Sequence, residues 1–146
     1  MTVNDNHEEN YPANRVEDLL AKASAEQLKE WIAGGAASLP EQMSPTWHGR
    51  ALRLLSVLLP ALTYLRDHGD LVLDRTSMVQ SFSLESMAKL AFFANLPNEI
   101  SEKILRYLED LPGYNRQYAL IGQFDNGARK LQDYLLCELG IEKKLA

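Results

Sequence analysis

Residues Ser44–Gly69 read SPTWHGRALRLLSVLLPALTYLRDHG, and this stretch decides how the chain folds. Its two ends carry the signals of a single helix over about residues 45–68. The Ser44 hydroxyl can accept a hydrogen bond from a free first-turn amide, and Pro45 suits the first helical position, where no N–H is needed. Gly69 suits the left-handed conformation that commonly follows a helix end.

The middle of this helix is apolar on nearly every side, which is typical of a helix at the centre of a domain. Its uncharged run, Leu54–Leu65, has about 12 residues, whereas a membrane-spanning helix needs roughly 20. We therefore expect a buried core helix. Pro60 leaves the Ser56 carbonyl without its helical partner, so we also expect a bend there.

The composition is that of a soluble globular protein. The 146 residues are enough for one domain with a real core, and the formal net charge is −5. This charge argues mildly against nucleic acid as the main ligand, because free-standing nucleic-acid binders usually carry a basic surface. Cys137 is the single cysteine, which excludes an internal disulfide; we expect it to be a small buried apolar residue in a reducing compartment. The polar, acidic first 15 residues do not form a signal peptide.

The rest of the chain predicts an all-α fold, a compact bundle of five to seven helices around the central one. A flexible segment is expected at 1–13, one helical domain at 14–141 and a polar tail at 142–146. We expect residues 70–74 to be extended with their apolar side chains on the core, and Thr76 to cap a short turn. Further helices are expected at 14–23, 25–33 (ended by Gly34 and Gly35), 84–94, 99–111 and 115–139, the last with a close crossing or a break near 124–127.

The sequence lacks the usual signatures of catalysis and of cofactor binding. It contains no phosphate-binding loop, dinucleotide fingerprint, zinc-protease helix or nucleophile elbow. His48 and His68 lie near opposite ends of a helix about 30 Å long, so they cannot share a metal ion. We therefore expect no enzyme activity, no metal and no cofactor in this chain.

Two groups of residues are candidates for contact with a partner. Arg50 and Arg53 lie three residues apart near Trp47, and arginine and tryptophan are enriched at binding hot spots. The second group, Tyr107, Tyr114, Arg116 and Tyr118, surrounds the Pro112-Gly113 turn. For each group the alternative is structural: Trp47 in the core with solvated arginines, and aromatic packing at a helix corner.

Several segments resemble the all-alpha domain of type IV secretion coupling proteins, and the closer subgroup is that of IncI-type conjugative plasmids and Dot/Icm systems. The resemblance covers roughly Glu26 to Leu136. It is carried by Ala51-Leu52-Arg53…Leu59-Pro60-Ala61-Leu62…Leu65-Arg66-Asp67…Gly69, by Leu84-Glu85-Ser86-Met87…Leu90 and by Tyr107-Leu108-Glu109-Asp110-Leu111-Pro112-Gly113-Tyr114. The sequence departs from the family where Phe124-Asp125-Asn126-Gly127-Ala128 stands in place of a glutamine-histidine-glycine-tyrosine element.

The resemblance implies a role in substrate recognition. Coupling proteins of this family are membrane-anchored, hexameric ATPases, and their all-alpha domain is an insertion that is thought to recognise a relaxase, an accessory protein or the transferred DNA. By this resemblance the chain would lie at the cytoplasmic face of the inner membrane, and the isolated domain would be a monomer. Direct DNA binding would use Arg50, Arg53 and Lys89, which should then cluster in space. The alternative is a stand-alone helical adaptor or small regulatory protein-interaction domain.

Overall fold

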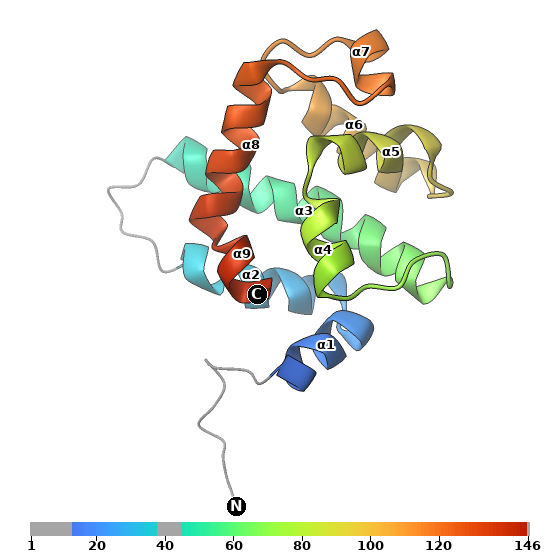
Figure 1. Ribbon diagram of the computed structural model, residues 1–146, viewed down its shortest axis with the longest axis vertical. Coiled ribbons are helices and arrows are strands. Elements are labelled where there is room, and N and C mark those ends of the chain that lie inside the picture. Colours follow the sequence, from blue (N-terminus) through green and yellow to red (C-terminus); the bar gives the residue numbers. More distant parts are fainter. Residues whose placement is uncertain (1–12, 38–44, 146) are drawn as a thin grey trace, which may run out of the picture.

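The computed structural model describes residues 13–37 and 45–145, and these residues form helices joined by short connections (Figure 1). The all-α prediction is confirmed, but the described residues contain nine helices instead of five to seven. Their bounds are α1 Ala13–Lys22, α2 Ala25–Ala37, α3 Pro45–Asp67, α4 Arg75–Ser81, α5 Leu84–Phe93, α6 Asn98–Glu109, α7 Arg116–Leu120, α8 Asn126–Leu139 and α9 Ile141–Leu145.

Helix α3 is the centre of the molecule, as its sequence predicts. It crosses the middle of Figure 1, with α1 and α2 below it and α5, α6 and α7 above it. Helices α2, α6 and α8 all pack against it. Gly69 follows its end with a φ of 77°, in the left-handed region. The apolar residues of its middle are buried: Leu54, Leu55, Val57, Leu58, Leu59, Ala61, Leu62 and Leu65.

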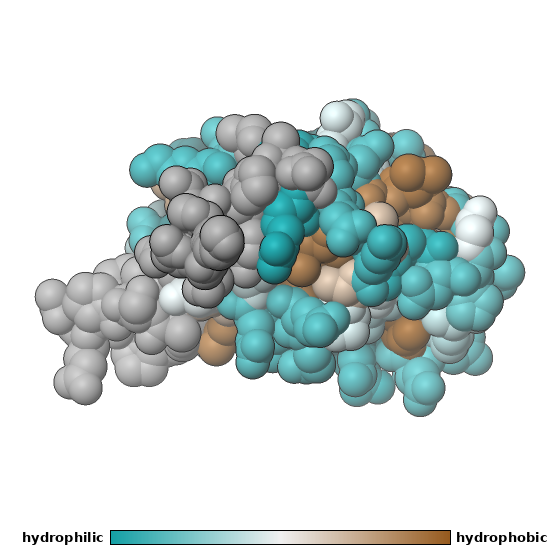
Figure 2. All heavy atoms as spheres, turned by 90° about the horizontal axis from the view of Figure 1, so that it is seen from below, coloured by the Kyte–Doolittle hydropathy of each residue, from teal (hydrophilic) through white to brown (hydrophobic). Residues whose placement is uncertain are grey.

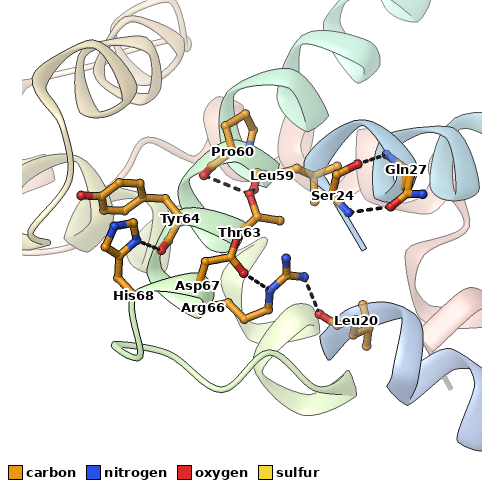
Figure 3. A network of polar contacts seen from close by, with 10 residues as sticks. All are labelled: Leu20, Ser24, Gln27, Leu59, Pro60, Thr63, Tyr64, Arg66, Asp67 and His68. Carbon is orange, nitrogen blue, oxygen red and sulfur yellow. Dashed lines mark hydrogen bonds and ion pairs between the residues drawn. The ribbon is translucent and has the colours of Figure 1, made fainter. Parts of the chain in front are cut away.

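Polar contacts hold the second half of α3 in place (Figure 3). Helix α3 continues through Pro60, and the Thr63 hydroxyl, 3.0 Å from the Leu59 carbonyl, donates to it. Arg66 reaches across to α1, where Nη1 donates to the Leu20 carbonyl at 2.9 Å, while Nε pairs with Asp67 at 2.9 Å. The contact between Arg66 and Leu20 connects α1 to the core helix. The bend expected at Pro60 stays a prediction.

One buried amide connects three parts of the core. The Tyr107 hydroxyl on α6 donates to Oε1 of Gln132 on α8 at 2.7 Å. Nε2 of the same Gln132 donates at 2.7 Å to the Phe82 carbonyl, which lies between α4 and α5. Burial raises the pKa of Tyr107 although Arg53 and Arg50 act in the opposite direction, so its hydroxyl keeps its proton. Every polar atom of this small network therefore has a partner.

Two predicted local signals in the first half of the chain are wrong. Helix α2 does not stop at Gly34 and Gly35 but runs to Ala37. Glycine weakens a helix by about 1 kcal/mol without blocking it, and the buried face of α2 against α3 is enough to continue it. Asp74, not Thr76, caps α4: its carboxylate accepts from the Ser77 amide at 2.9 Å.

The predicted extended connection before α4 is correct only in part. Leu73 is buried there, but Val72 is 78% exposed. The expected cap at Ser44 lies outside the described residues. So does the flexible segment expected at 1–13, except for Ala13, which begins α1.

The prediction of one long helix over 115–139 is wrong, because the chain forms two helices there, α7 and α8. A break near 124–127 was the alternative that the sequence allowed. Gly122 takes a φ of 76° after α7, and the Asp125 side chain caps α8 by accepting from the Gly127 amide at 2.9 Å. Gly113 is required nearby, since its φ is 67° and an added Cβ would lie 2.7 Å from the Cβ of Asp125.

The chain beyond α8 is also different from the expected polar tail. Residues 141–145 form α9, with Ile141 and Leu145 buried. The Lys144 ammonium donates to the Ile32 carbonyl of α2, and burial lowers the Lys144 pKa. Cys137, expected to be buried, is exposed instead. It lies on the outer side of α8, because Leu135 and Leu139 already provide the buried face there.

Candidate functional site

An apolar hollow lies between α5 and α7, with a volume of about 730 Å³. We call it the α5–α7 groove. Glu85, Lys89 and Phe93 line it from α5, and Ala119, Ile121 and Gly122 line it from α7 and the residues that follow. Apolar surface predominates in its walls, as it does in most sites that bind other molecules.

The sequence places these side chains on one face of α5. Glu85, Lys89 and Phe93 are spaced by four residues, so they follow one another along the same side of the helix. Ser83 starts the helix by accepting a hydrogen bond from the Ser86 amide at 3.1 Å. Met87 on another face is fully buried. Helix α5 is therefore anchored to the core while one of its faces remains available.

Helix α7 forms the opposite wall because the chain turns sharply at both of its ends. At its start, Oδ1 of Asn115 accepts from the amides of Gln117 and Tyr118. At its end, the left-handed Gly122 lets the backbone approach Glu85, whose Cγ would lie 3.5 Å from an added Cβ. Five residues of helix are thus held beside α5.

The groove leaves large apolar side chains in contact with solvent. Phe93 is 67% exposed and Ile121 is 68% exposed, on opposite walls. Removing such surface from water is favourable by roughly 25 cal/mol for each Å², before the entropic costs of association are counted. The lower face of the molecule is mostly hydrophilic with separate apolar patches (Figure 2). Single exposed apolar residues are common on proteins, but two that face one hollow are typical of a contact site.

The charges around the groove are not balanced. Glu85 forms an ion pair with Arg129 at 2.8 Å. Partial burial raises the Glu85 pKa, but the hydrogen bond and charge of Arg129 and the Glu85 backbone amide outweigh it, so the pKa is lowered. Lys89 makes no ion pair with any residue that the structure describes. Arg116 lies nearby, with Cζ 5.1 Å from the centre of the Phe92 ring on α5. The groove's one carboxylate is neutralised, and positive charge remains.

Arg50 and Arg53 are brought together elsewhere, in a smaller hollow of about 280 Å³ between α3, α6 and α8. Arg53 pairs with Asp110 at 2.5 Å, and its Cζ lies 5.9 Å from the centre of the Tyr107 ring. Arg50 is exposed. Lys89 does not line this hollow, so the three cations proposed for DNA binding are divided between two sites. The Trp47 side chain lies outside the described part of the chain.

The tyrosines of the Pro112-Gly113 turn have separate surroundings. Tyr107 is buried in the core, as the structural alternative predicted. Tyr114 and Tyr118 line a third hollow of about 420 Å³, together with residues 123–125 that follow α7. The Tyr114 hydroxyl has no hydrogen-bond partner within the described residues. Burial and the charge of Glu109 raise its pKa, whereas Arg116 acts to lower it.

The sequence interpretation missed Phe93 and Ile121 as site residues. The signal for Phe93 is the pair Phe92-Phe93 at the end of a helix. Adjacent residues point about 100° apart, so a helix that buries one face tends to leave one of two such residues more exposed. Ile121 falls inside the single helix expected over 115–139, whereas the structure has two helices there, α7 and α8. Ile121 is exposed because the helix ends at Leu120. The sequence indicated a break only near 124–127, which would have left Ile121 inside the helix.

Two kinds of feature, a membrane-spanning helix and a metal-binding group, are not found among the described residues. None of their helices is long and apolar enough to cross a membrane. Their histidine, cysteine and acidic side chains form no group of three or more that could hold a metal ion.

Comparison with known proteins gives one informative relative. The chain is 26% identical over 84 residues to the type 4 coupling protein DotL of Legionella pneumophila. The match covers 49% of this chain but only 11% of DotL. No family model matches the chain, and no solved structure matches it. The chain is thus similar to a part of a type IV coupling protein, in agreement with the resemblance found in its sequence.

Proposed function

We propose that this chain is a protein-recognition domain related to the all-alpha domain of type IV coupling proteins. Its partner would be a relaxase, an accessory protein or another secreted protein substrate, bound in the α5–α7 groove. The observation that carries the proposal is the exposure of Phe93 and Ile121 on facing walls of one groove, in a chain similar to DotL. Hot spots of protein interfaces are commonly apolar or aromatic anchors that enter such hollows.

A protein partner fits the charges better than DNA does. Affinity for DNA comes largely from several cations that contact phosphates together. Here Arg53 is already paired with Asp110, and Lys89 lines another hollow than Arg50 does. The net charge of −5 adds a general repulsion toward a polyanion.

The proposal assigns this chain binding and no catalysis of its own. Any ATP hydrolysis would belong to a larger coupling protein, membrane-anchored and hexameric, with this domain at the cytoplasmic face of the membrane. Within that family we favour the IncI and Dot/Icm subgroup, on the motifs quoted above.

The test is crosslinking in cells that carry the complete secretion system. A photoreactive amino acid replaces Phe93 in the natural full-length protein, and in a matched control it replaces Val72, an exposed apolar residue outside the groove. We expect substrate or accessory proteins of the system to be crosslinked from position 93 and not from position 72. Equal crosslinking from both positions would contradict the proposal.

DNA binding is tested separately, by fluorescence anisotropy of a labelled single-stranded oligonucleotide across a salt series. A protein-recognition domain predicts no binding at low salt. Micromolar binding that weakens steeply with salt, and that is lost in Arg50→Ala, would instead favour DNA as the ligand.

A further inference from the structure

We infer that the α5–α7 groove binds an acidic amphipathic helix of its partner. This inference rests on the proposed function and specifies the form and the charge of the bound segment. It is carried by three features of the groove: the length of its α5 wall, the position of its apolar residues and the sign of its unpaired charge.

The dimensions of the groove suit two turns of helix. Helix α5 has 10 residues, which corresponds to about 15 Å. Helices that lie in apolar grooves present anchors at positions i, i+3 or i+4, and i+7, which span roughly 10 Å. Phe93 stands at the C-terminal end of α5 and Glu85 near its N-terminal end, so the apolar floor between them accommodates that spacing.

The charges select the sign of the partner. Glu85 is satisfied by Arg129 and offers no free carboxylate to a basic segment. Lys89 projects from the middle of the α5 wall without an ion pair in the described part of the chain, and Arg116 lies over Phe92. Carboxylates flanking the apolar anchors of a partner helix would meet Lys89 in the groove, and Arg116 adds positive charge beside α5. This charge favours association with an acidic partner and disfavours a basic one.

A second copy of this chain is a less suitable occupant. A two-fold dimer through the groove would bring the same patch of both subunits together. Lys89 of each copy would then face a groove that already holds the other Lys89, and two chains of net charge −5 repel one another. A separate acidic helix avoids the meeting of two Lys89 side chains, because it places carboxylates against Lys89 instead.

The experiment measures the binding of designed peptides to the full chain by fluorescence anisotropy. The probe is a labelled helical peptide of about 14 residues, with leucine or phenylalanine at i, i+3 and i+7 and glutamate at the flanking positions. One control peptide has lysine in place of each glutamate, and another has the same residues in scrambled order. We expect binding of the acidic peptide alone, with affinity that falls as salt is added.

Variants of the chain locate the binding. Phe93→Ala should weaken binding by about tenfold or more, as loss of an interface anchor does. Lys89→Glu should weaken binding of the acidic peptide and strengthen binding of the lysine peptide. Val72→Ala removes an exposed apolar side chain outside the groove and should change nothing. All three positions are exposed, and circular dichroism of each variant verifies that it is folded.

Three outcomes would overturn the inference: equal binding of acidic, basic and scrambled peptides, an equal effect of Val72→Ala and Phe93→Ala, or self-association of the chain that Phe93→Ala abolishes. The crosslinking at Phe93 separates this failure from failure of the proposed function. A substrate protein captured there through a basic or extended segment would contradict the acidic helix but support protein recognition.

Discussion

Helix α3 and helix α5 differ in how the molecule uses their apolar side chains. Helices α2, α6 and α8 pack against α3, and the leucines from Leu54 to Leu65 are buried. Helix α5 packs on α6 and α7, yet it leaves Phe93 largely exposed. The same kind of side chain thus stabilises the fold in one helix and remains available for contact in the other. Burial of an apolar side chain in the core therefore distinguishes residues that stabilise the fold from residues that can bind a partner.

The largest expected effect separates these two roles directly. Leu58→Ala on α3 should lower the free energy of unfolding by about 2–5 kcal/mol, because it leaves a cavity in a fully buried site. Phe93→Ala should change it by less than about 0.5 kcal/mol. Chemical denaturation of both variants measures the contrast. Similar losses from the two substitutions would mean that Phe93 belongs to the core.

Alanine substitution at Gly113, compared with Gly34 on α2, tests whether the turn before α7 is rigid. Gly113→Ala should destabilise the protein by about 2 kcal/mol or more, since its φ is 67° and the new Cβ would press on Asp125. Gly34→Ala is the matched control: an added Cβ there meets nothing within 4 Å inside α2, so stability should rise by roughly 0.5–1 kcal/mol. We expect the melting temperature to fall in Gly113→Ala and to rise in Gly34→Ala. An unchanged melting temperature of Gly113→Ala would show that the turn readily adjusts.

The buried amide of Gln132 sharpens the comparison at the level of single hydrogen bonds. Gln132→Leu leaves the Tyr107 hydroxyl and the Phe82 carbonyl without partners and should cost about 1–3 kcal/mol. Adding Tyr107→Phe to that variant should cost little more, because the orphaned hydroxyl is then gone. A double-mutant cycle in urea measures this coupling. Fully additive losses would contradict the network.

The smallest effect concerns the ion pair beside the groove. Because the Glu85 pKa is lowered in the folded chain, its contribution is present at neutral pH and disappears as pH falls through that lowered pKa. Glu85→Gln should therefore reduce stability by less than about 1 kcal/mol at pH 7, and by less near pH 3 than at pH 7. Urea titrations at both pH values test this, with Asp18→Gln as a comparison from an exposed ion pair on α1. A difference of the same size at low pH would be inconsistent with the pair.

The core could be predicted from the sequence because its signals are strong and local. The run from Leu54 to Leu65 is apolar on nearly every side, so burial is its stable arrangement. A Ser24–Gln27 capping box begins α2, with hydrogen bonds of 2.8 and 3.1 Å. The groove could not be predicted in this way. It depends on a break after Leu120 whose position is set by tertiary contacts of Gly122 and Asp125, and a shift of a few residues would have hidden Ile121.

The contact between Lys144 and Ile32 has a consequence for how the chain acquires its fold during synthesis. The two residues are 112 positions apart, and α8 and α9 leave the ribosome after the other helices that the structure describes. Because translation adds about 5–20 residues each second, α2 waits on the order of 5–20 s for these partners. Its inner face can pack on α3 during that time, but its contact with α8 forms only at the end. Folding of this domain is therefore completed by its last helices, and a ribosome that stalls before them would release a chain with an unfinished core.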